Sequence, residues 1–142
     1  MDNPELPKLV PVMPRMRARF GDGPMLVPSP REVEACMRSV PEGHITTVTR
    51  IREHLARKYA VPVTCPLTTG IFVRIAAEAA EEDAQAGRDP ITPYWRVVHD
   101  DGSLYDRFPG GLARQGEKLR AEGRRILPGK NGKPPKVVMD EA

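Results

Sequence analysis

The distribution of proline limits where this chain can form regular helix. The sequence has 142 residues and 16 prolines, of which seven lie in residues 1–30 and three more are Pro128, Pro134 and Pro135. Each proline fixes its own φ, lacks an amide donor and biases the preceding residue toward extended geometry. We therefore predict a Pro-rich N-terminal arm over residues 1–30, one domain over residues 31–127 and a flexible C-terminal tail over residues 128–142.

The composition fits a globular protein with no membrane segment. Hydrophobic residues make up 39% of the chain and charged residues 29%, which lies within globular limits. No apolar run approaches the roughly 18 residues that cross a bilayer, and residues 1–30 lack the apolar core of a secretory signal. We expect a cytoplasmic protein that does not contact membranes.

The cysteines and histidines indicate neither a metal site nor a disulfide framework. Cys36 and Cys65 are the two cysteines, and the three histidines are His44, His54 and His99. No pair has the spacing that places two ligands on one helix face. We predict no metal and no cofactor.

The small net charge of +3 hides two basic segments. Residues 114–136 contain eight basic and two acidic residues, and Arg15, Arg17 and Arg19 form a second basic patch. Clusters of this kind are typical of proteins that bind polyanions, although a solvated surface has the same composition. Residues 78–89 are acidic, so we expect no phosphate contact there.

The apolar periodicity predicts a mainly α domain with a short β excursion. Helices are expected at residues 30–39, 47–59, 67–86 and 112–122, the second capped by Thr46 or Thr47. In the third helix we expect Ile71, Ile75 and Ala79 to face the core. Short extended segments flank a tight turn at residues 99–102, where Asp101 precedes Gly102.

Five short motifs follow one another in the predicted domain. They are Val40–Thr47, Pro93–Val98, Asp101–Leu104, Gly110–Leu112 and Leu119–Gly123. In this order they resemble the motifs of the C-terminal DNA-binding domain of the methylated-DNA–protein cysteine methyltransferases. The resemblance covers residues 31–127 and implies a winged helix-turn-helix domain that docks in the DNA minor groove.

The nucleophile of that family is missing from this chain. Family members attack the alkyl group of a flipped O-alkylguanine with a Cys thiolate, which a neighbouring His and a Glu activate. Here Tyr94 occupies the Cys position and Trp95 the His position, and only Glu122 remains. Because a thiolate is needed for the attack, we predict no alkyl transfer and no enzyme. The chain then looks closest to the alkyltransferase-like proteins, which bind damaged DNA without repairing it.

The resemblance also implies where DNA would contact the protein. Val48 aligns with a family Tyr beside the phosphate of the flipped nucleotide, and Gly70 aligns with the Arg that fills the vacated base stack. The residues equivalent to the lesion pocket are Val48, Tyr94, Trp95, Arg96, Gly110, Gly111 and Glu122. The residues that we expect to contact DNA are Thr46, Thr47, Arg50, Thr68, Thr69, Gly70, Arg74, Arg114 and Lys118.

Several of these residues have a second interpretation. Tyr94 and Trp95 form either an aromatic wall for a base or part of the core. Thr68 and Thr69 either bind phosphate or cap a helix. Arg50 and Arg74 either compensate for the lost family residues or are ordinary solvated arginines. Arg96 is expected to support the site loop.

The leading hypothesis is a non-enzymatic protein that binds duplex DNA, mainly through phosphates, and senses alkylated or damaged DNA without repairing it. Its partner in a repair pathway, if it has one, is not identified by the sequence. The alternative is a protein-interaction or small-ligand binding module that uses the Pro-rich arms for docking. A third hypothesis, an enzyme that uses Tyr94 or Glu122 as acid or base, has no visible partner residue to support it.

Overall fold

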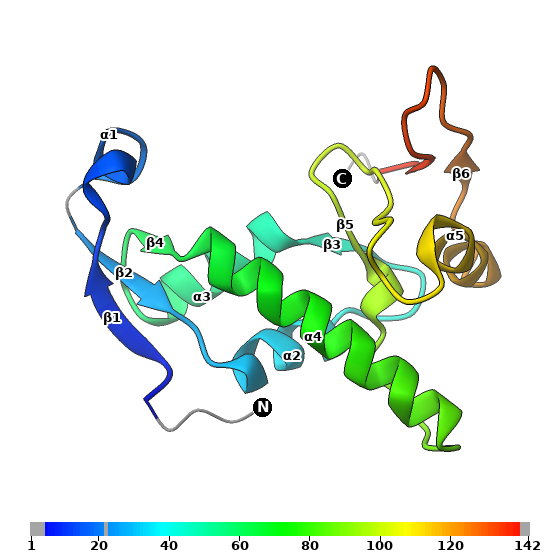
Figure 1. Ribbon diagram of the computed structural model, residues 1–142, viewed down its shortest axis with the longest axis horizontal. Helices are drawn as coiled ribbons and strands as arrows, with labels where there is room; N and C mark the ends of the chain where they lie inside the picture. Colours follow the sequence, from blue (N-terminus) through cyan, green and yellow to red (C-terminus); the bar gives the residue numbers. More distant parts are fainter. Residues whose placement is uncertain (1–4, 22, 140–142) are drawn as a thin grey trace.

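The computed structural model describes residues 5–21 and 23–139 (Figure 1). Its longest elements are helices, as predicted, and the described residues also form three small sheets. None of the described helices has the length and apolar character needed to span a membrane. The long helices are α2 (Pro30–Arg38), α3 (Val48–Lys58), α4 (Pro66–Gln85) and α5 (Gly111–Ala121).

The predicted helix starts follow from local capping. Ser29 accepts the N–H of Glu32 at 3.2 Å at the start of α2, and Thr47 accepts the N–H of Arg50 at 3.1 Å at the start of α3. The Cys65 sulfur accepts the N–H of Thr68 at 3.5 Å at the start of α4. These bonds satisfy amide groups that a helix leaves without an internal partner.

The predicted core face of α4 is wrong by a rotation of the helix. Ile71 is 38% exposed, and Ile75 and Ala79 are only half-buried. The alanines let α4 pack closely against α2 and α3, whereas the bulkier isoleucines lie outside this contact. The buried residues of α4 are Thr69, Val73, Ala76, Ala77 and Ala80.

The N-terminal segment belongs to the packed structure and is not the separate arm that we expected. Strand β1 (Lys8–Pro11) pairs antiparallel with β2 (Pro24–Val27), which pairs parallel with β4 (Val63–Thr64). The short helices η1 (Pro14–Met16) and α1 (Arg17–Phe20) connect β1 to β2. Val12 and Leu26 are each 1% exposed. Burial of these side chains offsets the cost of ordering a Pro-rich segment.

The C-terminal segment is likewise ordered through residue 139, in contrast to the predicted flexible tail. Strand β6 (Ile126–Leu127) pairs antiparallel with β7 (Lys136–Val137), and Val137 is buried. Strand β5 (Val97–Val98) pairs parallel with β3 (Thr46–Thr47). The predicted β excursion is therefore present, and the strand that pairs with it is β3. The predicted turn at residues 99–102 follows β5 and is closed by a hydrogen bond from the Gly102 N–H to the His99 carbonyl.

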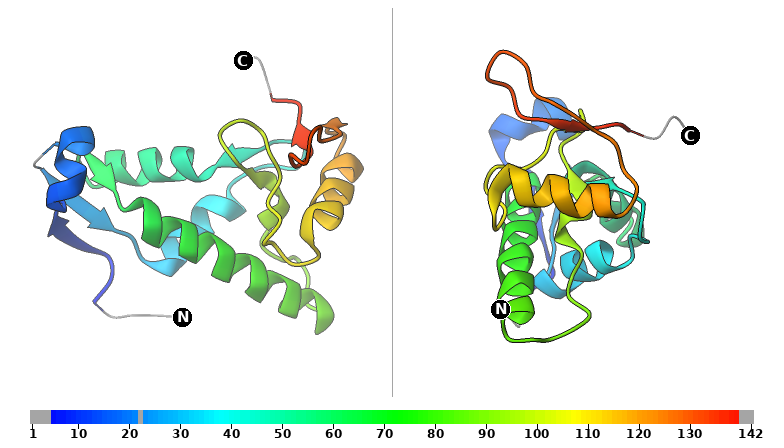
Figure 2. Two further views of the ribbon diagram at one scale, coloured as in Figure 1. Left: turned by 45° about the horizontal axis from the view of Figure 1, so that its top comes forward. Right: turned by 90° about the vertical axis from the view of Figure 1, so that its right-hand side faces the viewer.

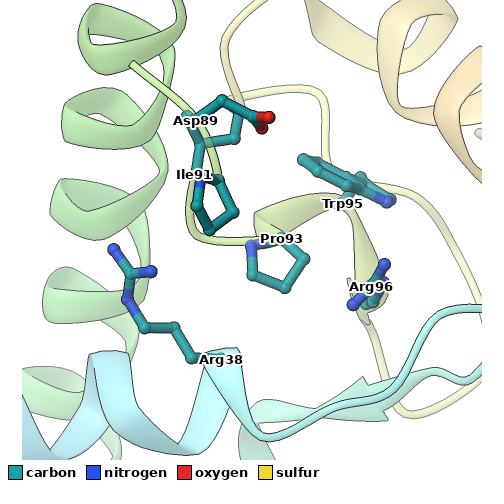
Figure 3. A pocket seen from close by; sticks show the side chains of 7 residues that line it. Arg38, Asp89, Ile91, Pro93, Trp95 and Arg96 are labelled. Carbon is teal, nitrogen blue, oxygen red and sulfur yellow. The ribbon is translucent and has the colours of Figure 1, made fainter.

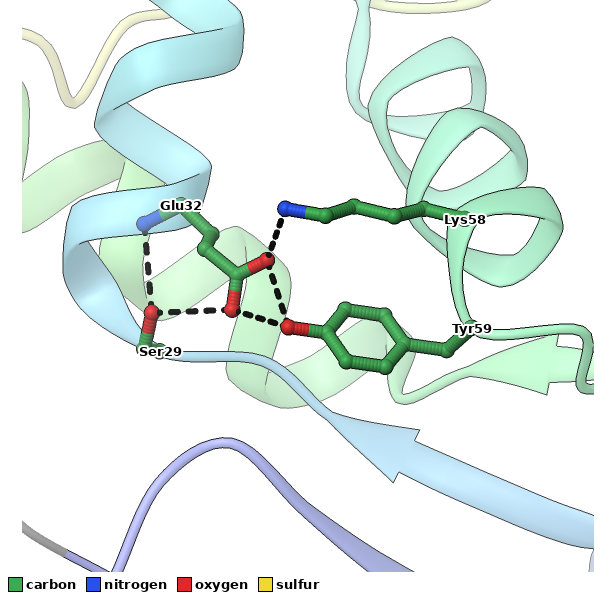
Figure 4. A network of polar contacts seen from close by, with 4 residues as sticks. All are labelled: Ser29, Glu32, Lys58 and Tyr59. Atoms are coloured by element: carbon green, nitrogen blue, oxygen red, sulfur yellow. Dashed lines mark hydrogen bonds and ion pairs between the residues drawn. The ribbon is translucent and has the colours of Figure 1, made fainter.

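A polar network joins the start of α2 to the end of α3 (Figure 4). The Glu32 carboxylate accepts the Tyr59 hydroxyl at 2.7 Å and the Lys58 ammonium at 3.0 Å. Burial alone would raise the pKa of Glu32, but the bonds from Tyr59 and Lys58 outweigh it and lower that pKa. The network fixes the angle between two helices that support α4.

Candidate nucleic-acid interface

The first turns of α3 and α4 enclose a cavity with the loop before α5. Val48, Gly70 and Arg74 line it on the helix side. The cavity measures about 130 Å³, which is below the roughly 300–1,000 Å³ of typical ligand pockets. The other lining residues are Val73, Tyr105, Arg107 and Phe108.

Stacked aromatic rings form the floor of this cavity. The Tyr105 ring stacks on Phe108 with centroids 4.5 Å apart and on His99 at 3.8 Å. Burial, followed by the nearby Asp100 carboxylate, raises the pKa of Tyr105 to about 12. Tyr105, Arg107 and Phe108 were missed in the sequence analysis, although two aromatic residues and a cation in the loop before Gly110–Gly111 were a usable signal.

Gly70 leaves the rim of the cavity open. A Cβ atom built at this position has no other atom within 4 Å. The backbone of Gly70 is helical within α4, so a residue with a Cβ would fit without backbone strain. The position aligned with the family arginine therefore tolerates the first atom of a side chain.

Tyr94 does not form an aromatic wall, because its ring is fully buried in the core. Its ring contacts Trp95 and Phe108 edge to face, at 5.3 and 5.6 Å between centroids. Its hydroxyl donates to Glu81 at 3.2 Å. Burial raises the pKa of Tyr94, while the nearby Arg114 guanidinium opposes the shift. The core interpretation is correct for this residue.

Trp95 is half-buried and lines a different cavity, of about 320 Å³ (Figure 3). Arg38 from α2 and Arg96 lie on the rim of this cavity, together with Asp89. The Lys118 ammonium lies 4.5 Å from the Trp95 ring centroid, within the range of a cation–π contact. Tyr94 and Trp95 thus point to different surroundings.

Arg96 makes bonds that hold its own segment, residues 94–96, in place. Its guanidinium donates to Glu122 at 2.6 and 3.0 Å and to the Val40 carbonyl at 2.7 Å. The Arg96 and Glu122 side chains are 13% and 8% exposed. Burial would raise the pKa of Glu122, but the Arg96 bonds and the Trp95 indole outweigh it and lower that pKa. The pair clamps helix η2 (Tyr94–Arg96) to the end of α5.

The Gly110–Gly111 pair ends the site loop and starts α5. Both residues have positive φ, 79° and 68°, a region that side chains with a Cβ rarely adopt. A Cβ at Gly110 would also meet the Arg114 side chain at 2.3 Å. These glycines shape the loop that carries Tyr105, Arg107 and Phe108.

The threonines are mostly engaged within the protein. Thr47 is buried and caps α3, and the buried Thr69 donates its hydroxyl to the Cys65 carbonyl at 2.7 Å. Thr68 is half-buried, with its hydroxyl 3.2 Å from the Cys65 sulfur. Thr46 lies in β3. Of the two predicted caps of α3, Thr47 is the one that caps it. The cap of α4 is Cys65 and neither Thr68 nor Thr69, and Thr69 bonds the backbone of the first turn.

The remaining basic candidates do not line the Gly70 cavity. Arg50 and Thr46 line a separate cavity of about 200 Å³ beside the end of α2. Arg114 forms an ion pair with Glu81 at 2.6 Å. Lys118 covers Trp95. Because Gly70 and Glu81 are 11 residues apart on α4, about 17 Å along its axis, Arg114 lies toward the acidic end of that helix.

Comparison with known proteins assigns the fold. No protein-family model and no curated protein matches the sequence. Two solved structures from S. pombe do match: Atl1 in complex with damaged DNA containing O6-carboxymethylguanine, and ATL in complex with DNA. Each is 19% identical, covers 80% of this chain and 94% of its own, and has a TM-score of 0.53. This chain therefore has the fold of S. pombe Atl1.

Proposed function

We propose that this protein binds duplex DNA and senses alkylated bases without removing the alkyl group. The observation that carries the proposal is the cavity at the start of α4. It joins Val48 and Gly70, which align with the two DNA-contacting positions of the family, to two cations, Arg74 and Arg107. A solved structure with the same fold holds DNA containing O6-carboxymethylguanine. We call these four residues the DNA face.

Charge supports DNA contact at this end of α4. Arg74 and Arg107 are exposed, and the N-terminus of α4 carries partial positive charge. We assign α3 and α4 to a helix-turn-helix and the loop before α5 to its wing. Binding would then depend on phosphate charge and duplex shape.

The chemistry of the site supports binding without alkyl transfer. Tyr94, at the family Cys position, is buried and bonded to Glu81, and Glu122 is held by Arg96. Burial, followed by the nearby Glu32 carboxylate, raises the pKa of the Cys36 thiol, which disfavours the nucleophilic thiolate. Cys65 caps α4. These positions give no group the role of the family nucleophile.

The alternative, a protein-interaction module with docking arms, loses its main support. Residues 8–11 and 24–27 pair in a sheet, so they are not available as extended proline ligands. DNA binding therefore remains the better explanation of the cavity that α3, α4 and the loop before α5 form together.

A duplex titration tests the proposal. Matched duplexes with and without one O6-alkylguanine are titrated over a salt series. We expect tighter binding to the modified duplex, salt-dependent affinity, and an unchanged protein mass with the lesion still in the DNA. Unmeasurable affinity at low salt, equal affinity for the two duplexes, or an alkylated protein would each contradict the proposal.

A pair of arginine variants locates the interface. Arg74→Gln should lower the slope of log affinity against log salt by about 0.9, because one phosphate contact is lost. Arg88→Gln removes the same charge at the acidic end of α4, where Arg88 pairs with Asp83, and should leave the slope unchanged. If both variants lower the slope equally, the first turns of α4 do not contact the DNA.

A further inference from the structure

Three arginines from separate parts of the chain line one cavity at the start of α4. Arg15 lies in η1, Arg19 in α1 and Arg52 in the second turn of α3. Together with Met16 and Pro66 they enclose about 370 Å³. The N-terminal segment thus brings two positive charges to the end of α4 at which the DNA face begins. We call Arg15, Arg19 and Arg52 the arginine cluster.

The sheet holds the N-terminal arginines in position. Helices η1 and α1 lie between β1 and β2, and β2 pairs with β4, which leads directly into α4. The N–H of Cys65, the residue before α4, donates to the Leu26 carbonyl at 2.8 Å. Figure 2 shows α1 at the end of the molecule where β4 and the start of α4 meet. The two arginines are therefore fixed relative to α4 by backbone pairing.

Arg52 is anchored from the helical side. Its Nε donates to the Thr64 carbonyl at 3.1 Å, and the Thr64 hydroxyl donates to the Arg52 carbonyl at 2.8 Å. Burial, followed by the positive charge of Arg19, lowers the pKa of Arg52, while Asp100 and Glu53 oppose the shift. Like charges that converge on one cavity repel each other, and a bound anion relieves that repulsion.

We propose that the arginine cluster binds a phosphate of the DNA backbone and extends the interface beyond the DNA face. The inference rests on the proposed function and adds a second contact to it. Pro66 lines this cavity and Gly70 lines the other, and the four-residue separation is about 6 Å along α4. The sugar-phosphate backbone of one DNA strand can therefore pass from the DNA face to the arginine cluster.

The geometry favours a phosphodiester over a small free anion. Arg15 and Arg19 are exposed on the rim, and only Arg52 is half-buried, so the cavity is open to a polymer that runs across it. Guanidinium groups bind phosphate oxygens through paired N–H donors. The N-terminus of α4 adds a favourable dipole at the same place.

Single and double variants of the full chain test the inference. Arg15→Gln and Arg19→Gln should each lower the slope of log affinity against log salt by about 0.9, and the double variant by about 1.8. Arg88→Gln serves as the matched one-charge control and should bind as the wild type. Arg52 is left unchanged because it holds β4. Because Arg19 makes a contact within the protein, thermal unfolding of every variant is measured as well, and binding is compared at a temperature at which all variants are folded.

Footprinting of the DNA backbone adds a measurement that a general loss of protein charge would not change. On a fixed duplex, the double variant should lose protection at one edge of the footprint and keep it at the lesion. Loss of affinity with an unshortened footprint would overturn the inference.

Three further outcomes separate this inference from the function on which it rests. If Arg74→Gln weakens binding but the Arg15 and Arg19 variants bind as the wild type, the arginine cluster is not a DNA contact and the proposed function stands. If the wild type binds no duplex, both fail. The NMR signals of Arg15 and Arg19 can also be followed during a titration with inorganic phosphate. If their shifts saturate below roughly 1 mM phosphate and the variants bind DNA as the wild type does, the cavity binds a free anion and the inference is wrong.

Discussion

Gly70 is the residue at which this chain departs most sharply from the alkyltransferase pattern while keeping space for the lost side chain. Extruding a base costs a few kcal/mol, which an inserted side chain helps to offset. No neighbouring element lies within 4 Å of a Cβ built at this position. The absence of an arginine here therefore affects DNA binding and does not affect packing of the protein. The residue can be restored by a single substitution.

Gly70→Arg should bind duplex DNA more tightly, with the larger gain on the duplex that carries O6-alkylguanine. The added cation should raise the salt slope by about 0.9. Gly70→Ala is the matched control: it should stabilise the fold by about 0.4–1 kcal/mol, because the unfolded chain loses freedom, and leave DNA affinity unchanged. Equal affinities of the two variants in the titration would show that position 70 does not face the DNA.

The Arg96–Glu122 pair stabilises the fold and makes its stability depend on pH. Both side chains are largely buried, and breaking such a pair costs about 3–5 kcal/mol. The pKa of Glu122 is lowered from 4.5, so its contribution is complete above pH 4.5 and is lost as the pH falls through the lowered value.

Glu122→Gln should therefore lower the free energy of unfolding by about 3 kcal/mol at pH 7, measured by urea denaturation. Its stability should also fall less than that of the wild type as the pH drops below 4.5. The exposed Glu117→Gln should change stability by less than about 0.5 kcal/mol. A wild-type acid response in Glu122→Gln would place the titrating group elsewhere.

Among the elements, the helices could be predicted from the sequence because their signals are local. Ser29 and Thr47 cap their helices within three residues along the chain. The face of α4 could not be read in the same way, because its alanines and isoleucines both recur at helical spacing. Which set is buried depends on how closely α2 and α3 approach, a tertiary property.

The corrected buried face of α4 predicts that two substitutions on this helix differ in how strongly they destabilise the fold. Ala77 is fully buried, so Ala77→Leu should overpack the contact with α2 and α3 and cost about 1–3 kcal/mol. Ile71→Gln should change stability by less than about 0.5 kcal/mol, because its side chain is already 38% exposed. Chemical denaturation of both variants checks this, and a larger loss in Ile71→Gln would favour the original assignment of the face.

The candidate site and the strands likewise depend on tertiary contacts that local sequence patterns do not predict. The motif order located Val48 and Gly70, but Tyr105 and Phe108 reach the cavity only through the loop conformation set by Gly110 and Gly111. The pairing of Met25 with Val63 joins residues far apart in sequence. The prolines argued against ordinary helices in residues 1–30, where the structure has the short helices η1 and α1. Pro11 lies opposite Pro24 at one end of the strand pair, but no local pattern identified the partner strand.

At the scale of the whole molecule, Leu26 joins the N-terminal sheet to the hydrophobic core that contains the site, while Val12, Met25 and Val63 form a separate buried cluster. Leu26 from β2 belongs to the same buried cluster as Tyr94 and Phe108, and Trp95 packs against that cluster. Figure 1 places the sheet at one end of the molecule and α5 at the other, with α4 running between them. A core shared along this length should unfold as one unit.

Leu26→Ala tests this unity. Leu26 is 1% exposed, and deleting its buried carbons should cost about 2–5 kcal/mol. The fluorescence of Trp95, the single tryptophan, and the circular dichroism of the helices should lose their signals at the same reduced denaturant concentration. Leu9→Ala, on the exposed side of β1, is the control and should shift neither midpoint. A Trp95 transition unaffected by Leu26→Ala would mean that the N-terminal sheet unfolds on its own, and the arginine cluster would then be held only as firmly as that sheet.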